Sequence, residues 1–562
     1  MRNRTGAATV VVSIMAVVGL GALATALLLP GSPLRPGASM SPPVALSSSP
    51  TPGATFTPTP GATPAPTPGA TPGATPSPTH EAFAAPSIPW PLVNLDPGIA
   101  SRGAHPTLSQ LSGYLYGNKA LLSVQSGVPL TDWRLSRPSM SAVSGYADAV
   151  SVTPGESIGL HLAGAYRTAR IDVFRLGAGD AQHLLTVPQV PVAPMVVPHP
   201  DATTGLDAMG WPLSYRLAVP PDWRSGVYLA KLSASGGQSY LLFVVRPLKP
   251  TALTVMVPML TFEAYNSWNG ISLYGWEPTS GNHPVRGYKV SLDRPFGAEN
   301  GAALLFRTAF PLIVWLEDHG YSPGYITDAD LAADPAWATG SRTVVIAGHS
   351  EYWTASMRDA LLAAEDRGVG VAAFGGNLIY RQIRLEPDSR GAPDRTVVCY
   401  KEAALDPLAR TQPELATIEF AKLPVPEPAS QVLGADWAGI TLQTRPLIVG
   451  NAIRTFAPDI GLKAGQALPA LMGGEVDQLT DTARGIALTQ TPLVNTAGQQ
   501  ISPTASLWIS PGGAHVFEAG TFAWTWGLDP RYAAALPGFP ADPFAHLTAE
   551  ILAWAGAFPA GG

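Results

Sequence analysis

The chain has 562 residues, of which 46% are hydrophobic and only 13% charged, so it can form buried cores and is not disordered throughout. Its formal net charge of -6 argues against nucleic acid as a partner. Cys399 is the single cysteine, which excludes an intrachain disulfide, so stability must come from hydrophobic cores or a metal.

The N-terminus carries a candidate membrane segment. Arg2 and Arg4 precede an apolar run at residues 7–29 that is long enough to cross a bilayer. We therefore predict a signal-anchor at residues 1–30, with the basic end in the cytoplasm and the rest of the chain outside. A cleaved signal peptide is the alternative, because the run is rich in alanine. The predicted location is extracytoplasmic and membrane-anchored, or secreted after cleavage.

Residues 31–81 have a strongly biased composition of Pro, Thr, Ala, Gly and Ser, and PTPGAT-like units recur at Pro58 and Pro66. Such a segment cannot bury a core and favours an extended, polyproline-like form. We expect a disordered stalk here.

Residues 82–248 are predicted to form an immunoglobulin-like β-sandwich. About seven short runs alternate between apolar and polar residues and are separated by turn signals. Gly236 and Gly237 indicate a hairpin between two of these runs. The clearest predicted strands are residues 157–166, 170–177, 225–234 and 239–247.

Residues 249–562 are predicted to form an α/β domain. Apolar runs expected to be strands alternate with helical patterns, which indicates a doubly wound parallel sheet of the glutamine-amidotransferase or flavodoxin-like kind. A β-rich insertion at about residues 384–500 interrupts this rhythm. The predicted strands are residues 253–258, 325–327, 343–346, 369–377, 505–510 and 515–520, and the predicted helices are residues 310–319, 355–367 and 544–555.

The turn after the predicted strand at residues 343–346 is the leading candidate for a functional site. Gly348 is followed by His349, Ser350 and Glu351, and Thr354 can cap the next helix. In open α/β sheets, ligands bind where strands end and helices begin.

Serine and thiol chemistry fit this turn poorly. Ser350 follows Gly348 as in a G-x-S-x-G elbow, but Tyr352 occupies the final glycine position. No cysteine lies at the elbow, as glutamine-amidotransferase chemistry would require. The zinc motif H-E-x-x-H is absent and the histidines are scattered, which disfavours a zinc site built from histidines.

An oxygen-rich metal site fits better. His349 and Glu351 can point into one cleft, and a carboxylate is a hard ligand. Tyr265 and Tyr274 flank a loop centred on Gly270, and phenolates suit ferric iron. The alternative is that both tyrosines are half-buried packing residues with hydrated hydroxyls.

Seven blocks of the chain, in order, resemble the catalytic domain of the N,N-dimethylformamidase large (beta) subunit family. The resemblance covers roughly residues 250–556, and the preceding β domain is also compatible with it. The blocks are AYNSWNGISLYGW (264–276), VSLDRPF (290–296), GHSEYWT (348–354), FGGNLIYRQIR (374–384), DRTVVCYKEAALDP (394–407), GGEVDQL (473–479) and AGTFAWTWGLDP (519–530).

The resemblance implies an iron-dependent amidohydrolase that cleaves a linear C–N amide bond. It implies one mononuclear, non-haem, ferric iron held by Tyr265, Tyr274 and Glu351. A water on that iron would attack the carbonyl of a small amide.

The same resemblance implies three catalytic residues beside the metal. Asn377 would orient the substrate carbonyl or the water, and His349 or Glu475 would protonate the departing amine.

Further expectations concern partners and neighbouring residues. Besides the small amide substrate and the single-pass anchor, a small partner subunit or a homo-oligomer is expected. Asp293 and Arg294 are expected to form a structural ion pair rather than to act on the substrate. Four tryptophans could form the wall of an apolar pocket or belong to the core: Trp268, Trp276, Trp524 and Trp526. The alternative function is a membrane-anchored extracytoplasmic binding or wall-associated module with an inactive site.

Overall fold

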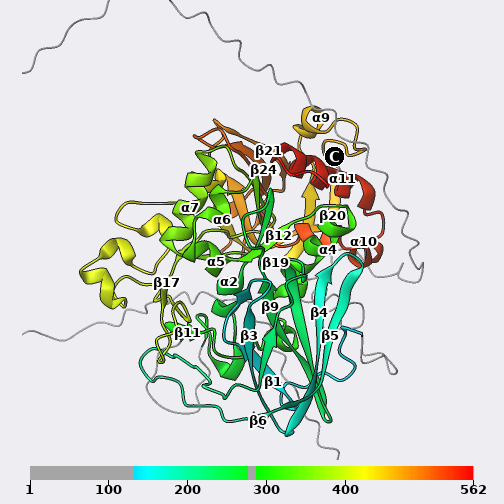
Figure 1. The fold of residues 1–562 in the computed structure, drawn as a ribbon. Coiled ribbons are helices and arrows are strands. Elements are labelled where there is room, and N and C mark those ends of the chain that lie inside the picture. Colours follow the sequence, from blue (N-terminus) through cyan, green and yellow to red (C-terminus); the bar gives the residue numbers. More distant parts are fainter. Residues whose placement is uncertain (1–131, 276–285, 561–562) are drawn as a thin grey trace, which may run out of the picture. The chain divides into compact units, whose positions relative to one another are not determined.

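The structure is a computed structural model that describes residues 132–275 and 286–560 (Figure 1). All of these residues belong to one unit of the chain, Ala85–Gly562. The predicted anchor at residues 1–30, the predicted stalk at residues 31–81 and Trp276 lie outside the described residues.

None of the helices in the described parts of the chain is long and apolar enough to cross a membrane. The longest of them, α11 (Ala541–Trp554), has 14 residues. At about 1.5 Å per residue it spans about 21 Å, whereas the hydrocarbon core of a bilayer is about 30 Å thick. This finding contradicts the predicted extracytoplasmic, membrane-anchored location, and we do not retain that prediction.

Residues 132–248, which we call the β domain, contain two sheets that face each other. The first holds β1 (Ser144–Ala147), β3 (Ser157–Gly164), β6 (Ala193–Pro194) and β7 (Tyr215–Ala218). The second has the order β2 (Ser151–Val152), β9 (Gly237–Val245), β8 (Gly226–Ala234), β4 (Thr168–Gly177) and β5 (Asp180–Pro191).

Alternation along these strands explains the packing of the β domain. One face of the second sheet packs against the first sheet through a core that contains Leu160, Ile171 and Phe243. The other face, with Phe174 and Tyr240, joins a core that continues into the rest of the protein. Assignment of this domain to the immunoglobulin-like class stays a prediction.

The C-terminal part is built on a seven-stranded sheet. Its first five strands run parallel to one another, and each of the last two pairs antiparallel with the strand before it. The order is β12 (Gly324–Thr327), β10 (Leu253–Val257), β13 (Thr343–Ile346), β15 (Gly370–Ala373), β25 (His515–Glu518), β24 (Thr504–Ile509) and β21 (Gly485–Gln490). The parallel strands are buried, as their continuous apolar runs require.

Helices cover both faces of this sheet (Figure 1). On one face lie α4 (Phe310–Asp318) and α11, whose apolar side chains share a core with Val255 and Val345. On the other face lie α2 (Met259–Ala264), α5 (Asp328–Ala333) and α7 (Ala355–Glu365), which share a core with Met256 and Ile346. The doubly wound class named above stays a prediction.

Shorter elements complete the described fold. The helices α3 (Leu305–Thr308), α6 (Ala336–Thr339), α8 (Ser430–Leu433), α9 (Ile453–Phe456) and α10 (Pro530–Ala535) are one or two turns long. Further strands are β11 (Lys289–Ser291), β14 (Tyr352–Trp353), β16 (Arg381–Gln382), β17 (Arg384–Glu386), β18 (Thr396–Val398), β22 (Leu493–Val494) and β23 (Gln500–Ile501).

A long antiparallel hairpin lies within the segment predicted as a β-rich insertion. Its strands are β19 (Ala435–Ile448) and β20 (Ala467–Leu479). A bridge between Val476 and Thr521 connects β20 to the segment that follows β25. The hairpin therefore brings Glu475, on β20, to the carboxyl end of the central sheet.

Candidate metal centre

The turn after β13 delivers two of the predicted site residues. Gly348 has φ 84, and a Cβ atom there would lie 2.7 Å from Cβ of Thr308. Only glycine tolerates both conditions, so the chain can turn sharply at this point. His349 and Glu351 follow and are 2% and 1% exposed.

Two tyrosines come from the segment that follows β10. Tyr265 is the C-terminal cap of α2, and the backbone N–H of Leu273 donates to the carbonyl of Ala264 at 3.1 Å. This contact closes a loop and places Tyr274 beside Tyr265, with the ring centroids 4.4 Å apart. Because β10 and β13 are adjacent parallel strands, this loop and the turn at Gly348 lie at the same edge of the sheet.

Three oxygen atoms from these segments meet at one point. Oε2 of Glu351 accepts hydrogen bonds from the hydroxyl of Tyr274 at 2.5 Å and from that of Tyr265 at 2.7 Å. The two hydroxyls are 2.9 Å apart. The structure therefore brings together the three residues predicted as metal ligands.

His349 borders this cluster. Its Nδ1 lies 2.8 Å from the carbonyl oxygen of Gly376, and its Nε2 lies 3.1 Å from the hydroxyl of Tyr265. Since Nδ1 donates to a carbonyl, Nε2 is directed at the oxygen cluster. Nε2 is 3.6 Å from Oε2 of Glu351.

Asn377 and Glu475 complete the set of predicted residues. Asn377 has φ 51, its backbone N–H donates to Asp477 at 2.9 Å, and its side-chain amide donates to Oε2 of Glu475. Oε1 of Glu475 lies 3.1 Å from the hydroxyl of Tyr265. Among the described residues, Oδ1 of Asn377 has no hydrogen-bond partner.

The pKa values of the two carboxylates shift in opposite directions. Burial would raise the pKa of Glu351, but His349, Arg381 and Lys401 outweigh it and lower this pKa. Burial and the charge of Glu351 raise the pKa of Glu475. Glu351 is therefore the residue that stays ionised.

The same buried, negatively charged surroundings shift the pKa values of the two tyrosines and of His349. Burial and the negative charge of Glu351 raise the pKa of both Tyr265 and Tyr274 well above the ordinary value. Burial would lower the pKa of His349, but Glu351 and Glu475 raise it overall. Without a cation among their oxygens, the two phenols therefore keep their protons.

Two basic residues of the site were not predicted from the sequence. Nε of Arg381 donates to Oε1 of Glu351 at 3.2 Å. Nζ of Lys401 lies 3.3 Å from the centroid of the Tyr274 ring. Both residues stand in blocks that carry the family resemblance, at 374–384 and 394–407, which is the signal that could have identified them.

One expectation about neighbouring residues is wrong. Asp293 and Arg294 do not pair with each other: Asp293 binds Arg395 and Arg294 binds Glu263. Both residues lie in the bend that follows β11, and each has a different partner.

The tryptophans and Ser350 are buried or packed within the protein. Trp524 and Trp526 are buried in the core beside α11, and Trp268 packs edge-on against Trp211. Ser350 is fully buried, and its hydroxyl accepts a hydrogen bond from the indole of Trp353.

The cluster has the composition of a metal-binding site. His349, Glu351 and Glu475 each offer one ligand atom, and these atoms lie within 4.8 Å of one another. The three residues could therefore hold a metal ion. The tyrosine hydroxyls add two further oxygen donors to the same place.

Comparison with known proteins identifies the family of the chain. No curated protein matches the chain. The family model described as "N,N-dimethylformamidase beta subunit-like, C-terminal" matches residues 170–535, well over half of the chain. The match starts within β4 and ends at the last residue of α10, so it includes part of the β domain and all six predicted site residues. The chain therefore belongs to the N,N-dimethylformamidase beta subunit-like family.

Proposed function

We propose that this protein is an amide hydrolase whose centre holds one iron ion between Tyr265, Tyr274 and Glu351. The observation that carries the proposal is the convergence of two phenol oxygens and one carboxylate oxygen within 2.9 Å of one another. Family membership supports the amide-hydrolase part, because the family description names an amidase.

The residues present fit such an ion. The hydroxyl of Tyr265 lies within 3.1 Å of four other polar atoms, on Glu351, Tyr274, His349 and Glu475. A hydroxyl has one proton to donate and two lone pairs, so it cannot satisfy four neighbours of this kind. A cation among the oxygens would relieve the crowding, and hard anionic donors favour ferric iron over softer metals.

When bound, such an ion would supply Lewis acidity, which polarises an amide carbonyl and lowers the pKa of water. Arg381 holds Glu351 from the side opposite the tyrosines through Oε1, which leaves Oε2 directed at the hydroxyls. The ammonium of Lys401 over the Tyr274 ring favours the phenolate form of that tyrosine.

The remaining residues are placed for proton transfer. Hydrolysis adds the elements of water across the C–N bond, so one proton leaves the water and one reaches the amine nitrogen. Glu475 lies between Tyr265 and Asn377 and is partly exposed, so it can exchange protons with both the centre and solvent. Asn377 holds the Glu475 carboxyl in place, and His349 orients the Tyr265 hydroxyl.

Metal content and amine release test the proposal. The full chain would be produced with ferric iron, and iron content, visible absorption and amine release from a panel of small amides would be measured. We expect about one iron per chain, a phenolate-to-iron absorption band, and release of amine from at least one amide.

A matched substitution makes the result specific. Glu351→Gln should abolish the band and the activity, while Glu414→Gln, which changes an exposed glutamate, should alter neither. Colourless, metal-free, inactive protein would refute the proposal and favour a binding module with an inactive site.

A further inference from the structure

We infer that Asp207 of the β domain and Arg294 are positioning residues for the metal centre. Together they hold residues 265–274, which we call the tyrosine loop, in the conformation that brings Tyr265 and Tyr274 together. The inference rests on the proposed function only for the part of its test that measures iron.

Arg294 binds backbone carbonyls of the tyrosine loop. Its guanidinium donates to the backbone carbonyl of Asn266 at 2.8 Å and to that of Ile271 at 3.1 Å. Nε of Arg294 also donates to Oε1 of Glu263 at 2.6 Å, in the helix that precedes the loop. One rigid, planar group therefore contacts the helix, the start of the loop and a point just before Tyr274.

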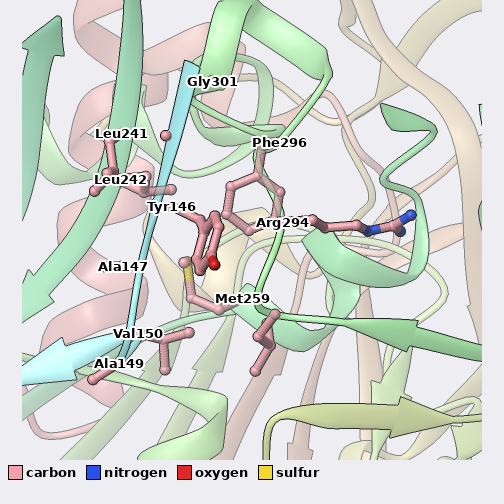
Figure 2. A pocket seen from close by; sticks show the side chains of 12 residues that line it. Tyr146, Ala147, Ala149, Val150, Leu241, Leu242, Met259, Arg294, Phe296 and Gly301 are labelled. Atoms are coloured by element: carbon pink, nitrogen blue, oxygen red, sulfur yellow. The ribbon is translucent and has the colours of Figure 1, made fainter. Parts of the chain in front are cut away.

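Figure 2 shows how the Arg294 side chain is oriented. Its aliphatic part helps to line a cavity of about 20 Å³ together with Tyr146, Met259 and Phe296, and its guanidinium points away from that cavity. A cavity of this size has room for about one water molecule. The charged group of Arg294 is therefore committed to the loop and not to a ligand in the cavity.

The β domain contributes a carboxylate to the same contacts. Asp207 is fully buried, and its Oδ2 accepts a hydrogen bond of 3.2 Å from the side-chain amide of Asn269, in the middle of the tyrosine loop. The same Oδ2 lies 3.9 Å from the guanidinium of Arg294. Asp207 therefore contacts both the loop and the residue that holds it.

Neighbouring contacts fix the position of Asp207 itself. The backbone N–H of Met209 donates to the carbonyl of Asp293 at 2.9 Å. Trp211 packs edge-on against Trp268 of the loop, with the ring centroids 5.9 Å apart. The segment of the β domain that carries Asp207 is thus tied both to the tyrosine loop, at Trp268, and to Asp293, the residue before Arg294.

The loop conformation is one that needs support. Asn269 has φ 57 and Gly270 has φ 78, so two successive residues adopt the left-handed region. For Asn269 this conformation is unfavourable and persists only where surrounding contacts impose it. The hydrogen bond from the Asn269 side chain to Asp207 is such a contact.

The test combines two substitutions at Asp207. Asp207→Ala removes the acceptor, whereas Asp207→Asn keeps an oxygen that can accept from Asn269. Neither leaves a buried charge without a partner, since Arg294 still has Glu263. Asp172→Ala is the matched control, because Asp172 is also a fully buried β-domain carboxylate but pairs with Arg170 in β4.

Hydrogen–deuterium exchange of the full chain gives a readout that does not depend on metal. In Asp207→Ala we expect the amides of residues 266–274 to exchange about three- to tenfold faster, the effect of losing one hydrogen bond, while α7 is unchanged. Asp207→Asn should restore exchange to near the level of the unmodified protein.

Iron gives the second readout. Asp207→Ala should bind ferric iron more weakly and shift or weaken the visible band, and Asp207→Asn should restore it. The inference is overturned if the loop amides of Asp207→Ala exchange as in the unmodified protein, or if Asp172→Ala loosens the loop to the same extent. If the unmodified protein binds no iron, the proposed function fails, and exchange alone still decides the inference.

Discussion

The hydroxyl of Tyr265 donates a hydrogen bond of 2.7 Å to Oε2 of Glu351, a residue 86 positions later in the chain. Tyr265 ends the helix after β10, and Glu351 follows the turn after β13. The contact exists because these two strands are parallel neighbours whose carboxyl ends lie side by side. It joins two of the three proposed metal ligands.

Removing either phenol should lower iron binding without unfolding the protein. We expect Tyr265→Phe and Tyr274→Phe each to reduce iron content at least about tenfold, because each loses one anionic oxygen donor. Iron content would be measured beside the thermal unfolding temperature. Tyr166→Phe, at an exposed tyrosine of the β domain, is the control and should bind iron normally. Full iron content in both site variants would show that the ligands are misassigned.

Gly348 should be intolerant of a side chain. Gly348→Ala places a Cβ 2.7 Å from Thr308 in a residue with φ 84, and should lower the free energy of unfolding by about 2 to 4 kcal/mol. Gly368→Ala is the matched control, because Gly368 has φ 78 but open space around it. Gly368→Ala should lower the free energy of unfolding by only about 1 kcal/mol, the cost of the left-handed backbone conformation alone. Denaturant unfolding measures both, and equal losses would contradict the steric explanation.

Glu365 should make stability fall as pH rises. It is 2% exposed, neither carboxylate oxygen has a hydrogen-bond partner within the described residues, and burial followed by the charge of Asp366 raises its pKa to about 9. The folded state therefore holds a proton that the unfolded chain, with an ordinary pKa of 4.5, releases. Stability is present in full below pH 4.5 and is lost as pH rises toward 9.

Glu365→Gln should remove this loss, because the amide stays neutral. Between about pH 5 and pH 9 the variant should gain a few kcal/mol relative to the unmodified protein. Unfolding free energies at several pH values measure the effect, with Glu414→Gln as the exposed control. Parallel pH curves for Glu365→Gln and the unmodified protein would be the contrary result.

Two substitutions at Asn377 should separate its backbone and side-chain roles. Asn377 has φ 51, which glycine adopts freely and alanine does not, so Asn377→Ala should be about 1 kcal/mol less stable than Asn377→Gly. Both lose the contact with Glu475, and amine release should fall about a hundredfold in both. Turnover close to that of the unmodified protein in Asn377→Gly would remove Asn377 from the catalytic residues.

The local elements could be predicted where the sequence pattern is strong. The strand predicted at residues 343–346 is β13, and the helix predicted to start after Thr354 is α7, whose cap is the Thr354 hydroxyl accepting from the Met357 N–H at 3.2 Å. The hairpin at Gly236 and Gly237 joins β8 and β9. These features depend on residues close together in the chain, so periodicity and turn residues are sufficient to indicate them.

His349, Glu351, Tyr265 and Tyr274 are candidates from the sequence pattern, whereas Asn377 and Glu475 follow only from the resemblance to a known family. The family match includes all six residues. Composition and spacing alone left Tyr265 and Tyr274 open as packing residues. The sequence also predicts a membrane anchor at residues 1–30, which lies outside the described residues, and none of the helices within those residues is long and apolar enough to cross a membrane.

By itself, the sequence determined strands with a strong apolar pattern, such as β13, the turn at Gly348 and the family to which the chain belongs. Tertiary structure alone decided which polar side chains meet: Arg381 with Glu351, Arg294 with Glu263, and Asn269 with Asp207 of the β domain. These partners are between 30 and 62 positions apart in the chain. Only the register of parallel strands and the packing of the β domain bring them within hydrogen-bonding distance, and no local pattern records either.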